Sequence, residues 1–310
     1  MKWLVFRRLL LLIPAALGVL TMVFFLVHLV PGDPVDLMLG ESAGVADRET
    51  LRHALGLDQS LPRQYEHFLG GLFRGDLGES FFYREPVARV IAERYPATVE
   101  LAVLALIVAL LIALPVGILA ASRPYTLWDN GAMFFSLLGV SLPNFWLGPL
   151  LILVFALKLS WFPVSGREGF ASVILPALTL GAGMAGILSR MIRSSLLEVM
   201  GEEYITAARS RGLSESVIWL RHALKNALTP VISVVGLQFG ALLSGAIITE
   251  TIFSWPGVGQ LLLTAISSRD YPLVQGCILV IAFTYLGVGL LADLLYAWMD
   301  PRIHYGRSAS

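Results

Sequence analysis

The stretch Glu203-Tyr-Ile-Thr-Ala-Ala-Arg-Ser-Arg-Gly-Leu-Ser-Glu215 sets the expected fold, because it interrupts long apolar segments with polar, helix-prone sequence. Residues 202–211 are good helix formers, and Gly212 is placed to end a helix. Ser214 can cap a second helix, with the Glu215 carboxylate near the positive end of its dipole. The stretch therefore predicts a short helix, a sharp turn and a second helix.

The rest of the chain is strongly apolar. Of its 310 residues, 56% are hydrophobic and 14% are charged, a charged fraction well below that of soluble domains. Basic and acidic residues number 22 each, so net charge gives no indication of nucleic-acid binding. Cys277 is the single cysteine, which excludes an intrachain disulfide. Lys2, Lys158 and Lys225, the three lysines, lie outside any P-loop motif, so ATP is not bound here through one.

Six apolar segments are long enough to cross a bilayer as helices, for which about 20 residues are needed. They cover roughly residues 9–30, 98–121, 131–157, 173–195, 229–250 and 273–298. Pro143 and Pro149 predict kinks in the third segment. Gly181, Gly183 and Gly186 predict close helix–helix contact in the fourth. The sequence therefore predicts an all-α membrane protein with six transmembrane helices.

Basic residues near the short loops give the orientation, because loops that carry them stay on the cytoplasmic side. They place both termini and the loop that holds the opening stretch in the cytoplasm. The long loop after the first segment is then extracytoplasmic. It contains the apolar stripe of an amphipathic helix, at Tyr65, Phe68, Leu69, Leu72 and Phe73. Such a stripe packs on its own protein more often than on a partner or a lipid surface.

The expected organisation has four parts. They are the cytoplasmic N-terminus with the first transmembrane helix (1–30), the extracytoplasmic loop region (31–97), a five-helix core (98–298) and a cytoplasmic tail (299–310). The core includes the polar loop 196–228. The residues alone leave two interpretations of that loop open: a docking element for a soluble partner, or an ordinary solvated helical hairpin.

The polar loop resembles the EAA loop of binding-protein-dependent ABC import permeases. The Glu-Ala-Ala…Gly pattern of that loop stands here as Thr206-Ala207-Ala208, three residues, and Gly212. Other fragments are similar to the dipeptide, oligopeptide and nickel branch, above all to first permease subunits of dipeptide transporters. They include 201–213, 221–230, 250–259, 31–34, 75–78, 269–272, 293–296 and 300–302. Their order and their coverage, from about residue 1 to 305, carry the resemblance.

The resemblance implies the fold of a type I ABC importer permease in the bacterial cytoplasmic (inner) membrane. It implies as partners a second homologous permease, two ATPase subunits, an extracytoplasmic solute-binding protein and the lipid bilayer, with no nucleic acid. This chain is then no enzyme and holds no cofactor or metal, because ATP and Mg are bound by the partner ATPases. The ATPase-coupling residues are Glu203, Tyr204, Thr206, Ala207, Ala208, Arg209, Arg211 and Gly212.

Two departures from the family pattern concern this loop. Thr206 replaces the first glutamate, so a carboxylate contact is not expected there. His222-Ala-Leu-Lys225 stands where the general motif has Ile-x-Leu-Pro, as is usual in the peptide branch. Ala207 and Ala208 are expected to leave a patch nearly free of side chains, which a groove on another protein can approach closely.

The solute path is expected between the two permeases. Polar residues inside a membrane face protein or a water-filled cavity. The candidate path residues are Ser141, Asn144, Gln238, Ser244 and Glu250. Hydrogen bonding between neighbouring helices explains each of them equally well. Asp293 is expected to be structural, paired with Arg190 or Arg193.

The expected function is uptake of dipeptides or short peptides that a solute-binding protein delivers. Nickel, glutathione and other small solutes of the same branch remain alternatives. An ion-coupled secondary transporter is a further alternative, but apart from Asp293 the apolar segments lack ionisable residues in their interiors. An intramembrane hydrolase would need a nucleophile motif, and none joins the serines and histidines.

Overall fold

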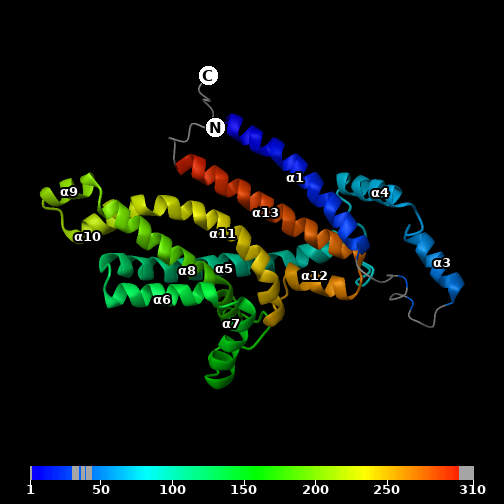
Figure 1. Ribbon diagram of the computed structural model, residues 1–310. Helices are drawn as coiled ribbons and strands as arrows, with labels where there is room; N and C mark the ends of the chain where they lie inside the picture. Colours follow the sequence, from blue (N-terminus) through cyan, green and yellow to red (C-terminus); the bar gives the residue numbers. More distant parts are fainter. Residues whose placement is uncertain (1, 30–34, 36–38, 40–43, 300–310) are drawn as a thin grey trace. The chain divides into compact units, whose positions relative to one another are not determined.

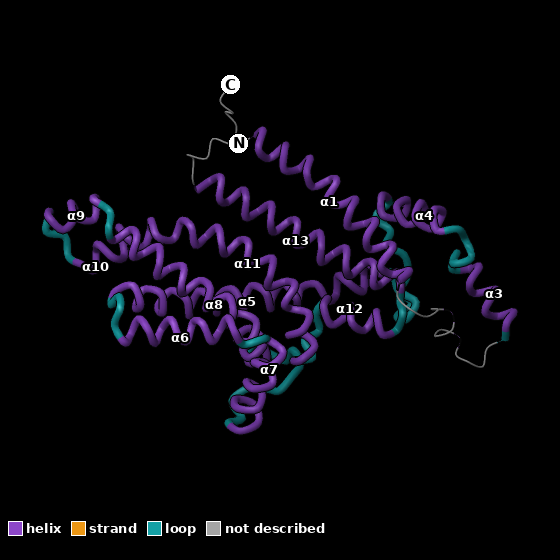
Figure 2. Tube along the Cα trace, viewed as in Figure 1, coloured by secondary structure: helices purple, strands orange, loops and turns teal. Residues whose placement is uncertain are grey.

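The computed structural model describes residues 2–29, 35, 39 and 44–299. The described residues are mostly helical, and the single β-feature among them is an isolated bridge between Glu79 and Pro86 (Figure 2). The expectation of an all-α protein is therefore confirmed for this part of the chain.

The helices are of two lengths (Figure 1). The long ones are α1 (Lys2–Leu29), α5 (Val87–Ser122), α8 (Ala171–Met200), α11 (Leu224–Ile252) and α13 (Tyr271–Met299). The shorter α-helices are α3 (Val45–Ala54), α4 (Leu61–Phe73), α6 (Leu127–Ser141), α7 (Asn144–Leu151), α9 (Glu203–Ser210), α10 (Glu215–Val217) and α12 (Val258–Ser267). Two π-helical segments, η1 (Ile152–Lys158) and η2 (Ile218–Ala223), continue α7 and α10.

Within the described residues, three helices are long and apolar enough to cross a membrane: α5, α8 and the part of α13 up to Ala292. Helix α6 and the α7–η1 segment meet that standard together, as one broken segment bent by 106°. Helix α1 covers the predicted first segment up to Leu29 and α11 covers the fifth, but not all their side chains are described. A total of six spans therefore stays a prediction.

The bend between α6 and α7 lies at Leu142 and Pro143. A residue before proline is pushed out of the helical region by the proline ring, and Leu142 is extended, with φ −81° and ψ 116°. The kink predicted at Pro143 is therefore confirmed. Helix α7 continues through Pro149 without a break and turns π-helical at Ile152.

The chain divides into two compact units. The core unit comprises Met1–Val5, Val99–Trp255 and Gly287–Ser310, and the N-terminal unit comprises Phe6–Thr98 and Pro256–Leu286. The boundary cuts the long helices α1, α5 and α13. The four parts expected from the sequence refer to sides of the membrane rather than to compact units, and they stay a prediction.

In the N-terminal unit, the apolar stripe of α4 packs on the unit's own helices. Its members Phe68, Leu69 and Leu72 lie against a buried cluster of Leu20, Val23 and Leu279. The hydroxyls of Tyr65 and Thr21 share a hydrogen bond of 2.7 Å. Packing of the stripe on its own protein is therefore confirmed for these residues. Phe73, at the end of the predicted stripe, instead is 85% exposed.

A buried carboxylate joins two loops of the same unit. Asp270 is fully buried, and its Oδ2 accepts hydrogen bonds from the Ser80 hydroxyl at 2.5 Å and the Phe82 amide at 3.1 Å. Its Oδ1 accepts a bond from the Leu273 amide at 3.2 Å. Asp270 thereby caps the N-terminus of α13, and these donors compensate for the loss of water around a buried charge.

In the core unit, α8 packs closely against α5 and α6. A Cβ atom added at Gly181 would lie 2.6 Å from the carbonyl oxygen of Ala105 on α5. A Cβ atom added at Gly186 would collide with the carbonyl oxygen of Ser136 on α6. The close helix contact predicted for these glycines is confirmed, and it makes α8 the central helix of the unit.

Candidate functional site

The polar stretch forms an elbow between α8 and α11, which we define as residues 201–223. Figure 1 shows α9 and α10 projecting beyond the ends of α8 and α11. Helix α9 ends at a turn where Gly212 has φ +76°, a conformation that L-residues with a side chain rarely adopt. The Gly212 amide donates to the Arg209 carbonyl at 2.9 Å. The predicted helix, turn and second helix are confirmed, with the second helix continuing as η2.

The start of the second helix differs from the expectation in one detail. Ser214 occupies the N-cap position, but its hydroxyl makes no capping hydrogen bond. Instead, the Glu215 carboxylate accepts hydrogen bonds from Nε and Nη2 of Arg209 at 2.7 and 3.2 Å, across the turn. Because these bonds favour the ionised carboxylate, they hold the pKa of Glu215 below its usual range. Arg209, which was expected to flank the docking patch, is thus bonded within the elbow.

Helix α9 has one face turned toward its own chain. Ile205 is fully buried and Ala208 is 7% exposed, and α9 packs on η2, in which Ile218 is also buried. The expected open patch of two alanines is therefore wrong for Ala208, whose methyl group is covered by its own chain. Only Ala207 of the pair is exposed. Ile205 and Ala208 are three residues apart and so share one face of the helix. The sequence does not tell which face of α9 is buried; only the packing of α9 on η2 shows it.

The opposite face of α9 is open and, apart from Glu203, carries short side chains. It consists of Glu203, Thr206, Ala207 and Ser210, all exposed and spaced i, i+3, i+4 and i+7. The Ser210 hydroxyl donates back to the Thr206 carbonyl at 3.1 Å, so this hydroxyl lies along the helix. We call these four residues the open face. A partner surface can approach the helix backbone more closely there than over long side chains.

A hydrogen bond braces the elbow on α11. The Asn226 amide donates to the Tyr204 hydroxyl at 2.7 Å and to the His222 carbonyl at 3.2 Å. Tyr204 was predicted as a coupling residue, and here its hydroxyl fixes α9 to the first turn of the next long helix. Asn226 was missed by the sequence analysis, because its partner lies 22 residues away and no local pattern joins them.

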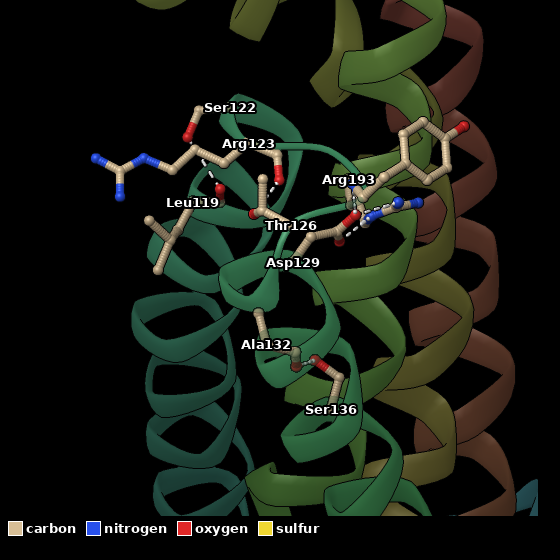
Figure 3. A network of polar contacts seen from close by, with 9 residues as sticks. Leu119, Ser122, Arg123, Thr126, Asp129, Ala132, Ser136 and Arg193 are labelled. Atoms are coloured by element: carbon tan, nitrogen blue, oxygen red, sulfur yellow. Dashed lines mark hydrogen bonds and ion pairs between the residues drawn. The ribbon is translucent and has the colours of Figure 1, made fainter.

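A second polar group lies on α8 before the elbow (Figure 3). Arg193 donates from Nε to Asp129 Oδ1 at 2.5 Å and from Nη2 to Oδ2 at 2.6 Å. Oδ2 also accepts the Tyr125 amide at 2.8 Å. The sequence did not indicate Asp129 as a partner of Arg193. The side chain of Asp293 lies outside the described residues, so its expected pairing with Arg190 or Arg193 stays a prediction.

The candidate path residues are spread over three helices of the core unit. Ser141 and Asn144 flank the bend between α6 and α7, the first exposed and the second half-buried. Gln238 is half-buried in α11, whereas Glu250, near the end of that helix, is fully buried. The side chain of Ser244 lies outside the described residues. A role of these residues in the path stays a prediction.

No group of three or more His, Cys, Asp or Glu side chains able to hold a metal ion occurs among the residues searched, which are the described ones. The open face offers polar and apolar contacts but no arrangement of a nucleophile and a base. Its chemistry is suited to binding a protein surface.

Comparison with known families adds the context for this site. Residues 113–305 match the family of the binding-protein-dependent transport system inner membrane component. The chain belongs to this family. Residues 1–102 match the N-terminal family of the same membrane components. The protein is therefore a multi-pass membrane subunit of an ABC transport system.

Curated relatives of this permease match it over nearly the whole length. It is 41% identical to the dipeptide transport system permease protein DppB of Escherichia coli (strain K12), which aligns with 97% of this chain and over 98% of its own length. It is 43% identical to the di/tripeptide transport system permease protein DppB of Pseudomonas aeruginosa, with coverage of 97% and 98%. It is 42% identical to the glutathione transport system permease protein GsiC of Pectobacterium atrosepticum, with coverage of 96% and 98%.

Solved structures share the fold at lower identity. A chain of the inward-facing MetNI methionine ABC transporter superposes with a TM-score of 0.57 and 17% identity, covering 68% of this permease and 96% of that chain. A chain of an amino acid ABC transporter crystallised with histidines gives a TM-score of 0.52 and 15% identity, with coverage of 70% and 95%. These likenesses place the permease in the fold of ABC transporter membrane subunits.

Proposed function

We propose that this permease is the membrane-spanning subunit of an ATP-driven importer of dipeptides and other short peptides. The observation that carries the proposal is the match to dipeptide, di/tripeptide and glutathione permeases at 41–43% identity over nearly the whole length of both chains. Glutathione is itself a small peptide, so the three relatives define one chemical class of solute. A dipeptide is the proposed main solute and glutathione the second candidate.

In this proposal the permease works in a complex with a second homologous permease, two ATPase subunits and an extracytoplasmic solute-binding protein. The proposed type I importer fold has six spans, with both termini and the elbow in the cytoplasm of a bacterial cell and the 31–97 region outside. The distribution of basic residues near the short loops supports this orientation. ATP and Mg belong to the ATPase subunits, and this chain performs no covalent chemistry.

The proposed role of the elbow is to dock into a cleft of one ATPase subunit. Four features of the structure support it: α9 projects beyond α8 and α11, its open face carries short side chains, its turn is braced by Arg209 and Glu215, and Tyr204 is bonded to Asn226. A rigid element moves with its partner instead of deforming. Closure of the ATPases would then move α8 and α11 and rock the permeases between inward- and outward-open states.

Docking of the open face is tested by placing a photo-crosslinker at Ala207. Cys277, the one cysteine of the chain, is fully buried, so Ala207→Cys supplies an accessible thiol for a benzophenone maleimide. In the assembled complex the labelled residue is expected to crosslink to an ATPase subunit. Phe73→Cys, at an 85% exposed position of the 31–97 region, is the matched control and should give no ATPase adduct. An adduct of residue 207 with the solute-binding protein would contradict the docking proposal.

The solute is tested by uptake into proteoliposomes that contain the complete complex, its binding protein and enclosed ATP. A labelled dipeptide should accumulate in an ATP-dependent manner, and a tenfold excess of glutathione should reduce that uptake only if the two share the path. Glutathione accumulation without dipeptide accumulation would transfer the proposal to the second candidate. Accumulation driven by an ion gradient without ATP would overturn the importer proposal.

A further inference from the structure

We infer that the Asp129–Arg193 ion pair is the link that makes α6 follow α8 when the elbow moves. The inference rests on the proposed function, because it assumes that the elbow receives the movement of an ATPase. Both residues are then positioning residues: neither touches a solute or an ATPase, and each acts through the helix that carries it.

The ion pair is bidentate, because two nitrogen atoms of Arg193 bond to the two carboxylate oxygens of Asp129. Two parallel N–H···O bonds of 2.5 and 2.6 Å join the guanidinium to the two carboxylate oxygens, an arrangement that fixes orientation as well as distance. The Asp129 side chain is 3% exposed and that of Arg193 22%, so water screens the pair little. As Figure 3 shows, the two side chains approach each other from α6 and α8, within the core unit.

The ion pair joins α6 to α8 near the end of α8 that leads into the elbow. Movement of the elbow would reach α8 at this end. Arg193 lies two turns before the end of α8 at Met200, a rise of about 10 Å, and the elbow follows directly. Asp129 lies in the first turn of α6. Its carboxylate also holds the amide of Tyr125, a residue with φ +61° in the loop that enters α6. The pair therefore fixes the end of α8, the start of α6 and the loop before it.

The remaining contact between α6 and α8 is of a different kind. Gly186 lies against the backbone of Ser136, and a Cβ atom at Gly139 would lie 2.9 Å from the carbonyl oxygen of Ala182. Close contacts between small residues keep helices together through dispersion, but they contain no directional bond. A buried bidentate ion pair does resist sliding, because a shift of one turn breaks both bonds and leaves two charges without partners.

A fixed register of α6 on α8 also affects the bend between α6 and α7. Helix α6 runs from Asp129 to Ser141, and the chain then turns by 106° into α7. Two of the predicted path residues, Ser141 and Asn144, flank this bend. With the pair intact, displacement of α8 carries the bend with it. Without the pair, the directional bonds that couple α8 to the start of α6 are lost.

If the ion pair has a purely structural role, replacing it should leave the number of ATP molecules hydrolysed per dipeptide unchanged. If it links α6 to α8, that number should rise. Replacing a buried ion pair by apolar residues of similar size is often neutral or stabilising. The double variant Asp129→Leu/Arg193→Met should therefore fold and assemble whichever role is correct. It loses the directional bonds that fix the register of α6 on α8, together with the bond from the Tyr125 amide to Asp129 Oδ2.

The experiment compares the complete complex with wild-type and variant permease in proteoliposomes. The measured quantity is the number of ATP molecules hydrolysed per dipeptide taken up, together with the amount of assembled complex in gel filtration. For the double variant we expect assembly within a factor of two of wild type and a rise in the ATP-to-dipeptide ratio of at least tenfold. Arg89→Gln is the matched control. It breaks the exposed pair of Arg89 with Glu93 on α5, and it should leave the ratio unchanged.

Two outcomes would overturn the link: a wild-type ratio in the double variant, or fewer complexes that each keep the wild-type ratio. The elbow variant Gly212→Val separates this failure from failure of the proposed function. If Gly212→Val abolishes uptake while the double variant keeps the wild-type ratio, only the link between α6 and α8 is wrong. If a well-inserted Gly212→Val permease transports normally, the role of the elbow itself is wrong.

Discussion

Gly212→Val is expected to reduce uptake more than tenfold while the permease remains in the membrane in normal amount. The reason is conformational: no atom lies within 4 Å of a Cβ atom added at Gly212, so the space is open, but its φ of +76° is in the left-handed region. That region costs an ordinary L-residue about 1–2 kcal/mol, and β-branching makes it worse. The turn would rearrange, and α9 would no longer present the open face at the same angle.

Gly212→Asn is the matched control, because asparagine adopts left-handed conformations far more readily than valine. Uptake by the assembled complex and the amount of permease in the membrane are measured for both variants. The asparagine variant should keep most of its uptake. Equal activity of the two variants would show that the geometry of the turn is not what transport requires.

Gly186→Ala is expected to destabilise the permease strongly. The added methyl group would collide with the backbone carbonyl of Ser136, which cannot move aside as a flexible side chain could. Overpacking of a tight contact costs typically about 1–3 kcal/mol, and a midpoint of thermal unfolding lower by roughly 2–5 °C is the corresponding result. The measurement is thermal unfolding of the purified permease, combined with the yield of assembled complex.

Gly183→Ala is the matched control for Gly186→Ala, because it adds the same methyl group to the same helix. A Cβ atom at Gly183 would meet the carbonyl oxygen of Gly139 at 3.6 Å, which is an ordinary contact. The same methyl group on the same helix should therefore change the midpoint little. A similar loss of stability in both variants would mean that the close contact of Gly186 with Ser136 does not determine the effect, since helix propensity favours alanine at both positions.

Features that depend on local backbone rules could be predicted from the sequence. The turn at Gly212 follows from the left-handed conformation that ends helices, and the bend before Pro143 follows from the restriction on residues that precede proline. The stripe of α4 follows from its periodicity. In each case neighbours in the sequence determine the result, and the structure confirms it.

Features that depend on how helices are rotated and paired could not be predicted. Which of Ala207 and Ala208 is exposed depends on the direction in which α9 faces η2, and both alanines look alike in the sequence. Asp129 and Arg193 are separated by 64 residues, and several charged residues lie near the ends of the predicted segments. Only the tertiary arrangement identifies Asp129 as a partner of Arg193, and no local pattern in the sequence indicates it.

The elbow is attached at both ends to a long helix, α8 before it and α11 after it. These two helices pack along each other. A protrusion anchored at one end acts as a cantilever, and much of a small displacement at its tip is lost in flexing. A loop clamped at both ends transmits a push as torque on the pair of helices beneath it. A displacement of a few ångströms at α9 would therefore tilt α8 and α11 together.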